Sequence, residues 1–297
     1  MTHRLWLEMA GLDLRTTGLC LRRLKRRNRE DTASVISADG PVVSMTSYGK
    51  RIDTVYLTLE SIGRGVLLPR RLILWLDDET AFKNRPDSLR RLEARGLEVR
   101  LAGSYGPHTK YYPYLESQTA LNAPLVTADD DTLYPAGWLK GLADGFTQYP
   151  GLVSCCRAHK ILLEGPGFAP YVTWERCAST EPSILNFATG VSGVIYPPAL
   201  QRQLKAAGLD FVGLCPKADD VWLHLQALRG GFQVRQVKPW EQSFPTLPGT
   251  QGTGLIQGNV HGSQNDVQIR RTYTAADIAL LQSAYILQES AAAPPKD

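Results

Sequence analysis

The chain has 297 residues, of which 43% are hydrophobic and 21% are charged, and its formal net charge is +4. This composition is typical of a globular protein with a large core, and it excludes a chain that is mainly disordered. No apolar run approaches the roughly 20 residues that a membrane-spanning helix needs, and no short repeat indicates a solenoid.

Positive charge is concentrated at the N-terminus. Residues 1–30 hold eight Arg or Lys and three acids, a local net charge of +5 that leaves −1 for the rest of the chain. A near-neutral body lacks the basic surface that nucleic acids require, so we expect no nucleic-acid partner. Residues 1–38 are predicted to form either a solvated surface helix or an interfacial helix on an anionic membrane.

The five cysteines form no Cys-x-x-Cys pair, and none has a zinc-site spacing to a histidine. We expect the adjacent Cys155 and Cys156 to pack as small apolar residues. The N-terminus lacks the apolar stretch and cleavage site of a signal peptide, which favours a reducing, cytoplasmic compartment.

From Pro41 onward, predicted strands alternate with predicted helices. The strands are expected at 42–45, 71–76, 97–101 and 123–127, and the helices at 52–62, around 89–95 and near 111–119. This alternation predicts a parallel sheet with crossover helices. Ligands bind beyond the carboxyl ends of such strands. Three strands end in polar clusters there, so we expect those clusters to lie together: 46–51, 77–79 and 129–131.

The second half has a less regular pattern. Residues 151–197 are rich in Gly, Pro and aromatic residues, which predicts short strands and loops. Helices are expected at 200–208 and 219–229, and a strand at 232–237. Residues 241–272 are expected to form a mobile loop. A last helix begins with a capping box made by Thr274 and Asp277, and residues 291–297 form a tail.

Three consecutive carboxylates, Asp129, Asp130 and Asp131, are the strongest chemical signal. They follow a predicted buried strand, and they repel one another unless a cation lies among them. Strand alternation would point Asp129 and Asp131 to one side, where two oxygen ligands suit Mg²⁺ or Mn²⁺ holding a diphosphate. The alternative is a solvated acidic turn that caps the next helix.

A second acid pair, Asp219 and Asp220, opens a predicted helix. One interpretation is N-capping, because the helix dipole stabilises negative charge there. The other makes one carboxylate a general base that takes a proton from an attacking hydroxyl.

Two further clusters combine cations with aromatic side chains. Residues 46–51 can hold a base and a ribose, although Lys50 and Arg51 also fit plain surface charges. Residues 108–114 place Lys110 beside three tyrosines. The lysine can neutralise a diphosphate, while the tyrosines alternatively form core and wall.

The order of these motifs resembles that of the GT-A glycosyltransferases, most closely the bacterial family-2-like branch. The motifs are strand–TSYGKRI–helix, strand–WLDDE, strand–DDDTLYP and the late acid pair. The resemblance covers roughly residues 41–240. It implies a single-domain, Rossmann-like α/β/α sandwich with a mostly parallel central sheet. The implied domain spans 39–290, with a nucleotide-sugar half at 39–135 and an acceptor half, including a C-terminal lid and helix, at 136–290.

The resemblance also implies residue roles. By the resemblance, the nucleotide is contacted by Thr46, Ser47, Tyr48 and Arg51, and the uracil edge is bound by Asp77 or Asp78. Lys110 lies near the diphosphate and Asp129 near the ribose. Asp131 binds the metal, and Asp130 is the alternative if the register differs by one residue. Asp220 matches the catalytic base of inverting members. Asp219 stands where the family usually has Glu, which leaves open which of the two acids is the base.

The C-terminal part adds a candidate third metal ligand, His261, which some GT-A enzymes supply from a comparable loop; the alternative is an ordinary surface or core histidine. Trp240, Asn265 and Asp266 are candidate lid residues, although the family's usual motif of Gln, Arg and Trp together is not clearly present.

The function that the resemblance implies is an inverting hexosyl transfer that depends on Mn²⁺ or Mg²⁺. The donor is a nucleotide-diphospho-sugar, expected to be a UDP-sugar, and the acceptor is a glycan or a lipid-linked oligosaccharide in bacterial surface polysaccharide synthesis. A basic N-terminus on an anionic membrane would place the protein at the inner face of the cell membrane. The alternatives are a retaining GT-A transferase and a non-catalytic nucleotide- or carbohydrate-binding protein.

Overall fold

The computed structural model describes residues 14–250 and 263–292. Its centre is a seven-stranded sheet in the order β11-β5-β10-β4-β1-β2-β3. The strands are β1 (Val42–Thr46), β2 (Arg71–Leu76), β3 (Leu97–Leu101), β4 (Leu125–Thr127), β5 (Val153–Cys155), β10 (Val194–Tyr196) and β11 (Val234–Gln236). Strand β10 runs antiparallel to both of its neighbours, and the other six strands are parallel. The expected mostly parallel sheet is confirmed.

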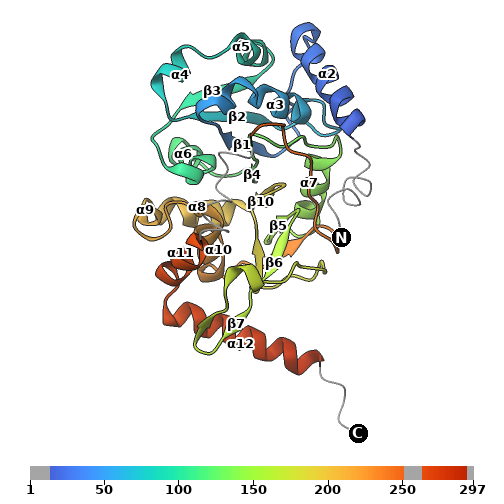
Figure 1. The fold of residues 1–297 in the computed structure, drawn as a ribbon. Helices are drawn as coiled ribbons and strands as arrows, with labels where there is room; N and C mark the ends of the chain where they lie inside the picture. Colours follow the sequence, from blue (N-terminus) through green and yellow to red (C-terminus); the bar gives the residue numbers. More distant parts are fainter. Residues whose placement is uncertain (1–13, 251–262, 293–297) are drawn as a thin grey trace.

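Helices cover both faces of this sheet (Figure 1). One layer holds α3 (Val55–Gly63), α5 (Asp87–Glu93) and α7 (Trp138–Gln148), and the other holds α6 (Tyr112–Ser117), α8 (Pro198–Ala206) and α10 (Asp219–Arg229). Along β1, Val43 and Met45 join the apolar cluster of the first layer, and Val42 joins that of the second. The period-two alternation of strand side chains thus builds two cores. The α/β/α sandwich expected from the sequence is confirmed.

Short elements fill the connections. They are η1 (Gly49–Asp53), α4 (Glu79–Lys83), η2 (Gly106–Lys110), the paired β6 (Ala158–Lys160) and β9 (Asn186–Ala188), the hairpin of β7 (Leu163–Glu164) and β8 (Gly167–Phe168), η3 (Tyr171–Thr173) and α9 (Asp210–Leu214). The short strands predicted within 151–197 are therefore present. Cys155 and Cys156 are buried and unbridged, as expected.

The expected mobile loop at 241–272 is wrong in its last part, because helix α11 (Gln264–Thr272) lies there. Its inward side chains are mostly polar, so the helix lacks an apolar periodicity that a sequence pattern would register. The side chain of Gln268 accepts a hydrogen bond from the Lys217 N–H, the Thr272 hydroxyl donates to the Gln268 carbonyl, and Ile269 supplies the apolar contact.

The C-terminal helix α12 (Ala275–Ala292) begins with the predicted capping box. The Thr274 N–H donates to a carboxylate oxygen of Asp277 at 2.8 Å, and the Asp277 N–H donates back to the Thr274 hydroxyl at 3.4 Å. Arg229, at the end of α10, adds two hydrogen bonds to the same carboxylate. This box therefore anchors α12 to α10.

Helix α2 (Leu14–Glu30) packs on α3 and α5. Leu24 is buried in this contact, and the fully buried carboxylate of Glu60 accepts hydrogen bonds from Arg27, Asn28 and Arg95. A buried carboxylate with three donors fixes the position of the helix. None of the described helices combines the length and the apolar character needed to cross a bilayer.

Candidate active site

The parallel neighbours β1 and β4 end at the same edge of the sheet, and their following residues meet there. The Ser47 hydroxyl donates to Asp130 at 2.6 Å. The Arg51 guanidinium donates to Asp130 at 2.6 Å and lies 3.2 Å from a carboxylate oxygen of Asp131. Two of the polar clusters predicted to converge therefore do so.

The third carboxylate, Asp129, has a different partner. Its Oδ1 lies 2.6 Å from Nζ of Lys110. Strand β4 ends at Thr127, so the strand alternation that we expected to orient Asp129 and Asp131 does not extend into the acidic turn. The Asp129 carboxylate lies beside Lys110, whereas the Asp131 carboxylate lies beside Arg51. Lys110 is held in place because its carbonyl accepts a hydrogen bond from Ser44, whose hydroxyl accepts another from Trp75.

Lys110 also faces the acid pair at the start of α10. Burial alone would lower the pKa of its ammonium, but Asp129, Asp219 and Asp220 outweigh that effect and raise the pKa well above its usual value. The lysine therefore remains charged in a site that excludes most water. The neighbouring tyrosines are buried, which favours the core interpretation for these aromatic rings: Tyr111, Tyr112 and Tyr114.

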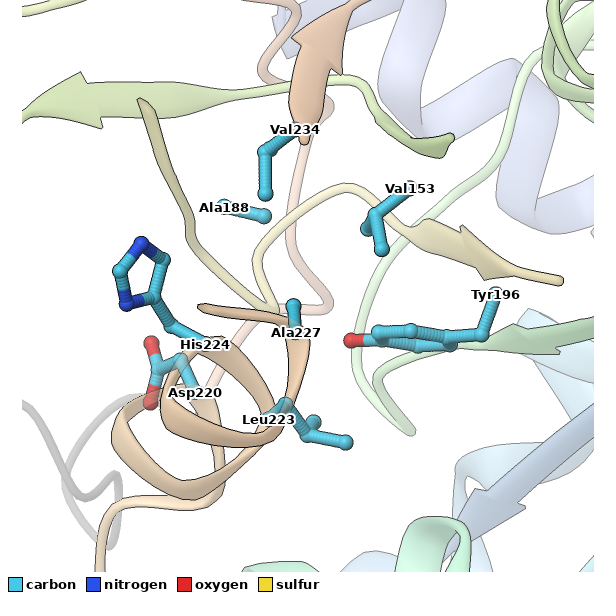
Figure 2. A pocket seen from close by; sticks show the side chains of 8 residues that line it. All are labelled: Val153, Ala188, Tyr196, Asp220, Leu223, His224, Ala227 and Val234. Carbon is cyan, nitrogen blue, oxygen red and sulfur yellow. The ribbon is translucent and has the colours of Figure 1, made fainter. Parts of the chain in front are cut away.

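Asp220 has the most unusual ionisation of the site. Burial and the adjacent Asp219 raise its pKa to about 7, against the opposing effects of Lys110 and of a hydrogen bond from the Gly190 N–H. A carboxyl group that titrates near neutral pH is matched to general-base catalysis. Asp220 lines a small cavity of about 10 Å³. Figure 2 shows it at the edge of that cavity, among mostly apolar side chains such as Leu223. These apolar neighbours supply the desolvation.

His224 lies one turn further along α10 and fixes the helix (Figure 2). Its Nε2 lies 2.9 Å from the Ile184 carbonyl and its Nδ1 2.6 Å from the Tyr273 hydroxyl. Burial lowers the pKa of His224 to about 4, so the ring is neutral at pH 7. Nε2 then donates to the carbonyl and Nδ1 accepts from Tyr273, which connects α10 to the chain just before α12.

The predicted nucleotide residues lie along the adjoining strand ends. The Thr46 hydroxyl donates to the Trp75 carbonyl, and Tyr48 exposes 43% of its surface beside the Arg51 guanidinium. Asp77 accepts a hydrogen bond from the Ser104 hydroxyl. Asp78 instead caps α4 by accepting from the Ala81 N–H at 2.6 Å.

The residues of this site provide only part of what the metal implied by the resemblance would need. Asp129 and Asp131 are hard oxygen donors of the kind that Mg²⁺ and Mn²⁺ prefer. Both are already next to cations, Lys110 and Arg51, and no cluster of three or more His, Cys, Asp or Glu that fits a metal occurs within 14–250 and 263–292. These residues do not form a metal centre by themselves, because a metal on Asp129 would have to displace Lys110. His261 lies outside the described residues.

Two parts of the site had no signal in the sequence. Gly190, between β9 and β10, reaches Asp220 from 30 positions earlier in the chain. Tyr171 in η3 is buried, and the Asp220 carboxylate contributes to the raised pKa of its hydroxyl. Neither residue belongs to a local motif, so only the folded chain brings them to the acid pair.

No family model and no curated protein sequence matches the chain. Among solved structures, CMP:2-keto-3-deoxy-manno-octonic acid synthetase complexed with CTP is 12% identical over 76% of this chain and 96% of that one, with a TM-score of 0.41. GalNAc-T7 with UDP, GalNAc and Mn²⁺ is 12% identical over 72% and 44%, with a TM-score of 0.49.

A third solved structure, S. aureus TarS 1–349 in complex with UDP, is 16% identical over 68% of this chain and 58% of that one, with a TM-score of 0.45. The chain thus spans about half the length of the GalNAc-T7 and TarS structures. At these identities and TM-scores, the similarities assign no residue role to this chain.

Proposed function

We propose that this protein is a glycosyltransferase that moves a sugar from a nucleotide-diphospho-sugar to a hydroxyl of a glycan or lipid-linked acceptor. The observation that carries the proposal is the acid pair at the start of α10, in which Asp219 is buried and Asp220 is partly buried. The pKa of Asp220 is raised to about 7 beside the Lys110–Asp129 ion pair. A base and a fixed cation in one site are what glycosyl transfer requires.

In the proposed reaction, the Asp220 carboxylate takes the proton of the acceptor hydroxyl while its oxygen attacks the anomeric carbon of the donor. The bond between that carbon and the diphosphate oxygen breaks, and the nucleoside diphosphate leaves with both electrons. The Lys110 ammonium neutralises the charge that develops on the diphosphate. Preorganised cations of this kind stabilise a transition state without reorganisation during the reaction.

The nucleoside is proposed to bind at the ends of β1 and β2. Tyr48 offers an exposed aromatic face, and Arg51 lies 5.5 Å above its ring centroid. For the uracil edge, Asp77 is the better candidate, because the carboxylate of Asp78 is engaged as a helix cap. This arrangement favours a UDP-sugar as the donor.

Inversion at the anomeric carbon follows from using Asp220 as a base rather than as a nucleophile. We also propose that a divalent cation binds at Asp129 and Asp131 only together with the donor, whose diphosphate oxygens would supply the ligands that these two residues lack by themselves. The retaining alternative would be favoured if His261 were a metal ligand, and His261 lies outside the described residues. The acid pair is our reason for proposing the inverting reaction.

We also propose that α2 contacts an anionic membrane surface. Its outward face carries five exposed cationic side chains, Arg22, Arg23, Lys25, Arg26 and Arg29, and the exposed Leu19. The opposite face is fixed to the protein through Leu24 and Arg27. Basic side chains near an anionic lipid surface contribute about 1 kcal/mol each. Such a contact would bring the site to a lipid-linked acceptor.

The experiment is a screen of UDP- and GDP-sugars for release of the nucleoside diphosphate, first without and then with oligosaccharide acceptors. We expect slow release from one donor and faster release when a suitable acceptor is present. Binding of UDP is followed in parallel as an upward shift of the melting temperature. A protein that binds UDP but releases no nucleotide from any donor would be a binding protein, and the proposed transfer would be wrong.

A further inference from the structure

A second group of charged side chains lies near the proposed base, on and around strand β6. Arg157 and His159 lie two residues apart on this segment, so they share one face, and an Arg157 NH2 group lies 3.3 Å from Nε2 of His159. Arg176 pairs with His159 across an antiparallel bridge. The side chain of Glu241 approaches both arginines, at 3.3 Å from Arg157 and 2.7 Å from Arg176.

This group has more positive charge than its own carboxylate neutralises. Two guanidinium groups face the single carboxylate of Glu241. Burial lowers the pKa of His159 to about 4, so its ring is neutral at pH 7 and can supply or accept one hydrogen bond. The group therefore keeps one net positive charge, with Arg157 and Glu241 partly buried and the Arg176 side chain exposed.

Several of its buried polar atoms also lack a hydrogen-bond partner in the described part of the chain, although Arg157 Nε and Glu241 Oε2 form an ion pair with each other at 3.3 Å. Among the residues that the structure describes, the buried atoms Arg157 Nε, His159 Nδ1 and Glu241 Oε2 have no hydrogen-bond partner, because the Arg157–Glu241 contact lacks hydrogen-bond geometry. Buried donors without partners cost folding free energy, and native proteins keep few of them. An oxyanion that displaces the Glu241 carboxylate from Arg157 would give the guanidinium a partner with hydrogen-bond geometry.

The group adjoins the acid pair through two connections. The Tyr171 ring lies 5.6 Å from the His159 ring, and the charges of both Asp220 and Arg157 act on its hydroxyl. The Arg157 carbonyl accepts a hydrogen bond from the Thr189 N–H, and the next residue, Gly190, donates to Asp220. A molecule that places a hydroxyl at Asp220 would therefore extend past Tyr171 toward Arg157.

We propose that Arg157, His159 and Arg176 form an acceptor subsite for an oxyanion, either a carboxylate or a phosphate, that the acceptor carries close to the hydroxyl that is glycosylated. Arginine suits this role because its planar donors match the two oxygens of such a group. The proposal rests on the proposed function, whose site it extends.

The test measures binding without any donor, by ligand-observed NMR with three probes: methyl β-glucuronide, methyl β-glucoside 6-phosphate and the neutral methyl β-glucoside. We expect at least one charged probe to bind about tenfold or more tightly than the neutral one, since charge-assisted hydrogen bonds carry that preference. Which charged probe binds more tightly identifies the oxyanion. Equal binding of all three probes, or no binding of either anion, would overturn the subsite.

Three variants sharpen the test. Arg157→Gln should abolish the preference for the charged probe, and Arg85→Gln, which removes an arginine from a comparable ion pair with Glu93 near α5, should keep it. Glu241→Gln should tighten anion binding, because it removes the competing carboxylate. A merely structural role of the cluster predicts no such gain, so unchanged or weaker anion binding by a folded Glu241→Gln protein would contradict the proposal. If the unmodified protein prefers the charged probe but transfers no sugar, the proposed function is refuted and the anion subsite stands.

Discussion

Nζ of Lys110 lies 2.6 Å from Oδ1 of Asp129, and this ion pair connects the turn after β4 to the acid pair at the start of α10. Lys110 comes from η2 and Asp129 from the edge of the sheet, so the contact joins two elements that the chain builds separately. The charge of Lys110 acts on both Asp219 and Asp220. The donor side and the proposed base therefore share one cation.

Removing one partner of this ion pair should destabilise the fold, because the other charge is left buried. We expect Lys110→Met and Asp129→Asn each to cost about 3 kcal/mol in urea unfolding, and the double variant to cost much less than the sum. Lys140→Met, in the exposed Lys140–Asp144 pair of α7, is the control and should change stability by less than about 0.5 kcal/mol. Additive losses in the double variant would show that Lys110 and Asp129 do not interact.

The proposed metal can be tested through UDP binding. If a divalent cation binds at Asp129 and Asp131, Mn²⁺ with UDP should raise the melting temperature further than UDP alone, and chelation should remove the increment. Asp131→Ala should abolish the increment and keep the metal-independent part. Equal melting temperatures with and without Mn²⁺ in the unmodified protein would contradict the metal assignment.

The capping box of α12 predicts a contribution to folding stability that decreases as the pH falls. Burial alone would raise the pKa of Asp277, but hydrogen bonds from Arg229 and Thr274 outweigh it and lower the pKa to about 2. The folded pKa is below the unfolded value, so this contribution is complete above about pH 4 and is lost as the pH falls toward 2. Asp277→Ala should cost about 1–2 kcal/mol at pH 7 in urea unfolding.

The same substitution has a matched control in Asp144→Ala, which removes an exposed carboxylate from α7 and should cost less than about 0.5 kcal/mol. The difference between the Asp277→Ala protein and the unmodified protein should shrink as the pH is lowered from 5 toward 2. A difference that stays constant over this range would show that the ionised carboxylate is not the source of the stabilisation.

The rate of transfer should depend on pH through Asp220. Since a general base acts when deprotonated and the pKa of Asp220 is raised to about 7, kcat/KM should fall below about pH 7 and level off above it. Lys110 lowers this pKa, so Lys110→Met should move the inflection to higher pH in whatever activity remains. A flat profile between about pH 5.5 and 8.5, with no loss of fold, would contradict the assignment.

Strands β1 to β4 and the polar clusters that follow them were predictable from local pattern. The strand that became β2 was predicted to the residue, because a continuous apolar run followed by Asp77 has few alternatives. The topology rule for parallel strands then predicted that the clusters 46–51 and 129–131 lie together, and the hydrogen bond from Ser47 to Asp130 bears this out. Motif and topology together sufficed for the part of the site that follows the strands.

What the sequence did not predict depends on contacts between distant segments or on polar packing. Nothing local indicates that Gly190 donates to Asp220 or that Tyr171 adjoins it. Helix α11 was missed because its buried face is made of polar residues such as Gln268. Asp78 resembles its neighbour in sequence, and only its geometry assigns it to a helix cap.

The most direct test of the central claim is the turnover of Asp220→Asn, measured with the best donor and acceptor found in the screen. The amide keeps the shape of the side chain but cannot take the proton, so we expect kcat to fall by about 10² or more while the UDP-induced shift in melting temperature is unchanged. Asp87→Asn, a similar change in the first turn of α5, should leave kcat unaffected. Turnover of Asp220→Asn at the rate of the unmodified protein would contradict the account.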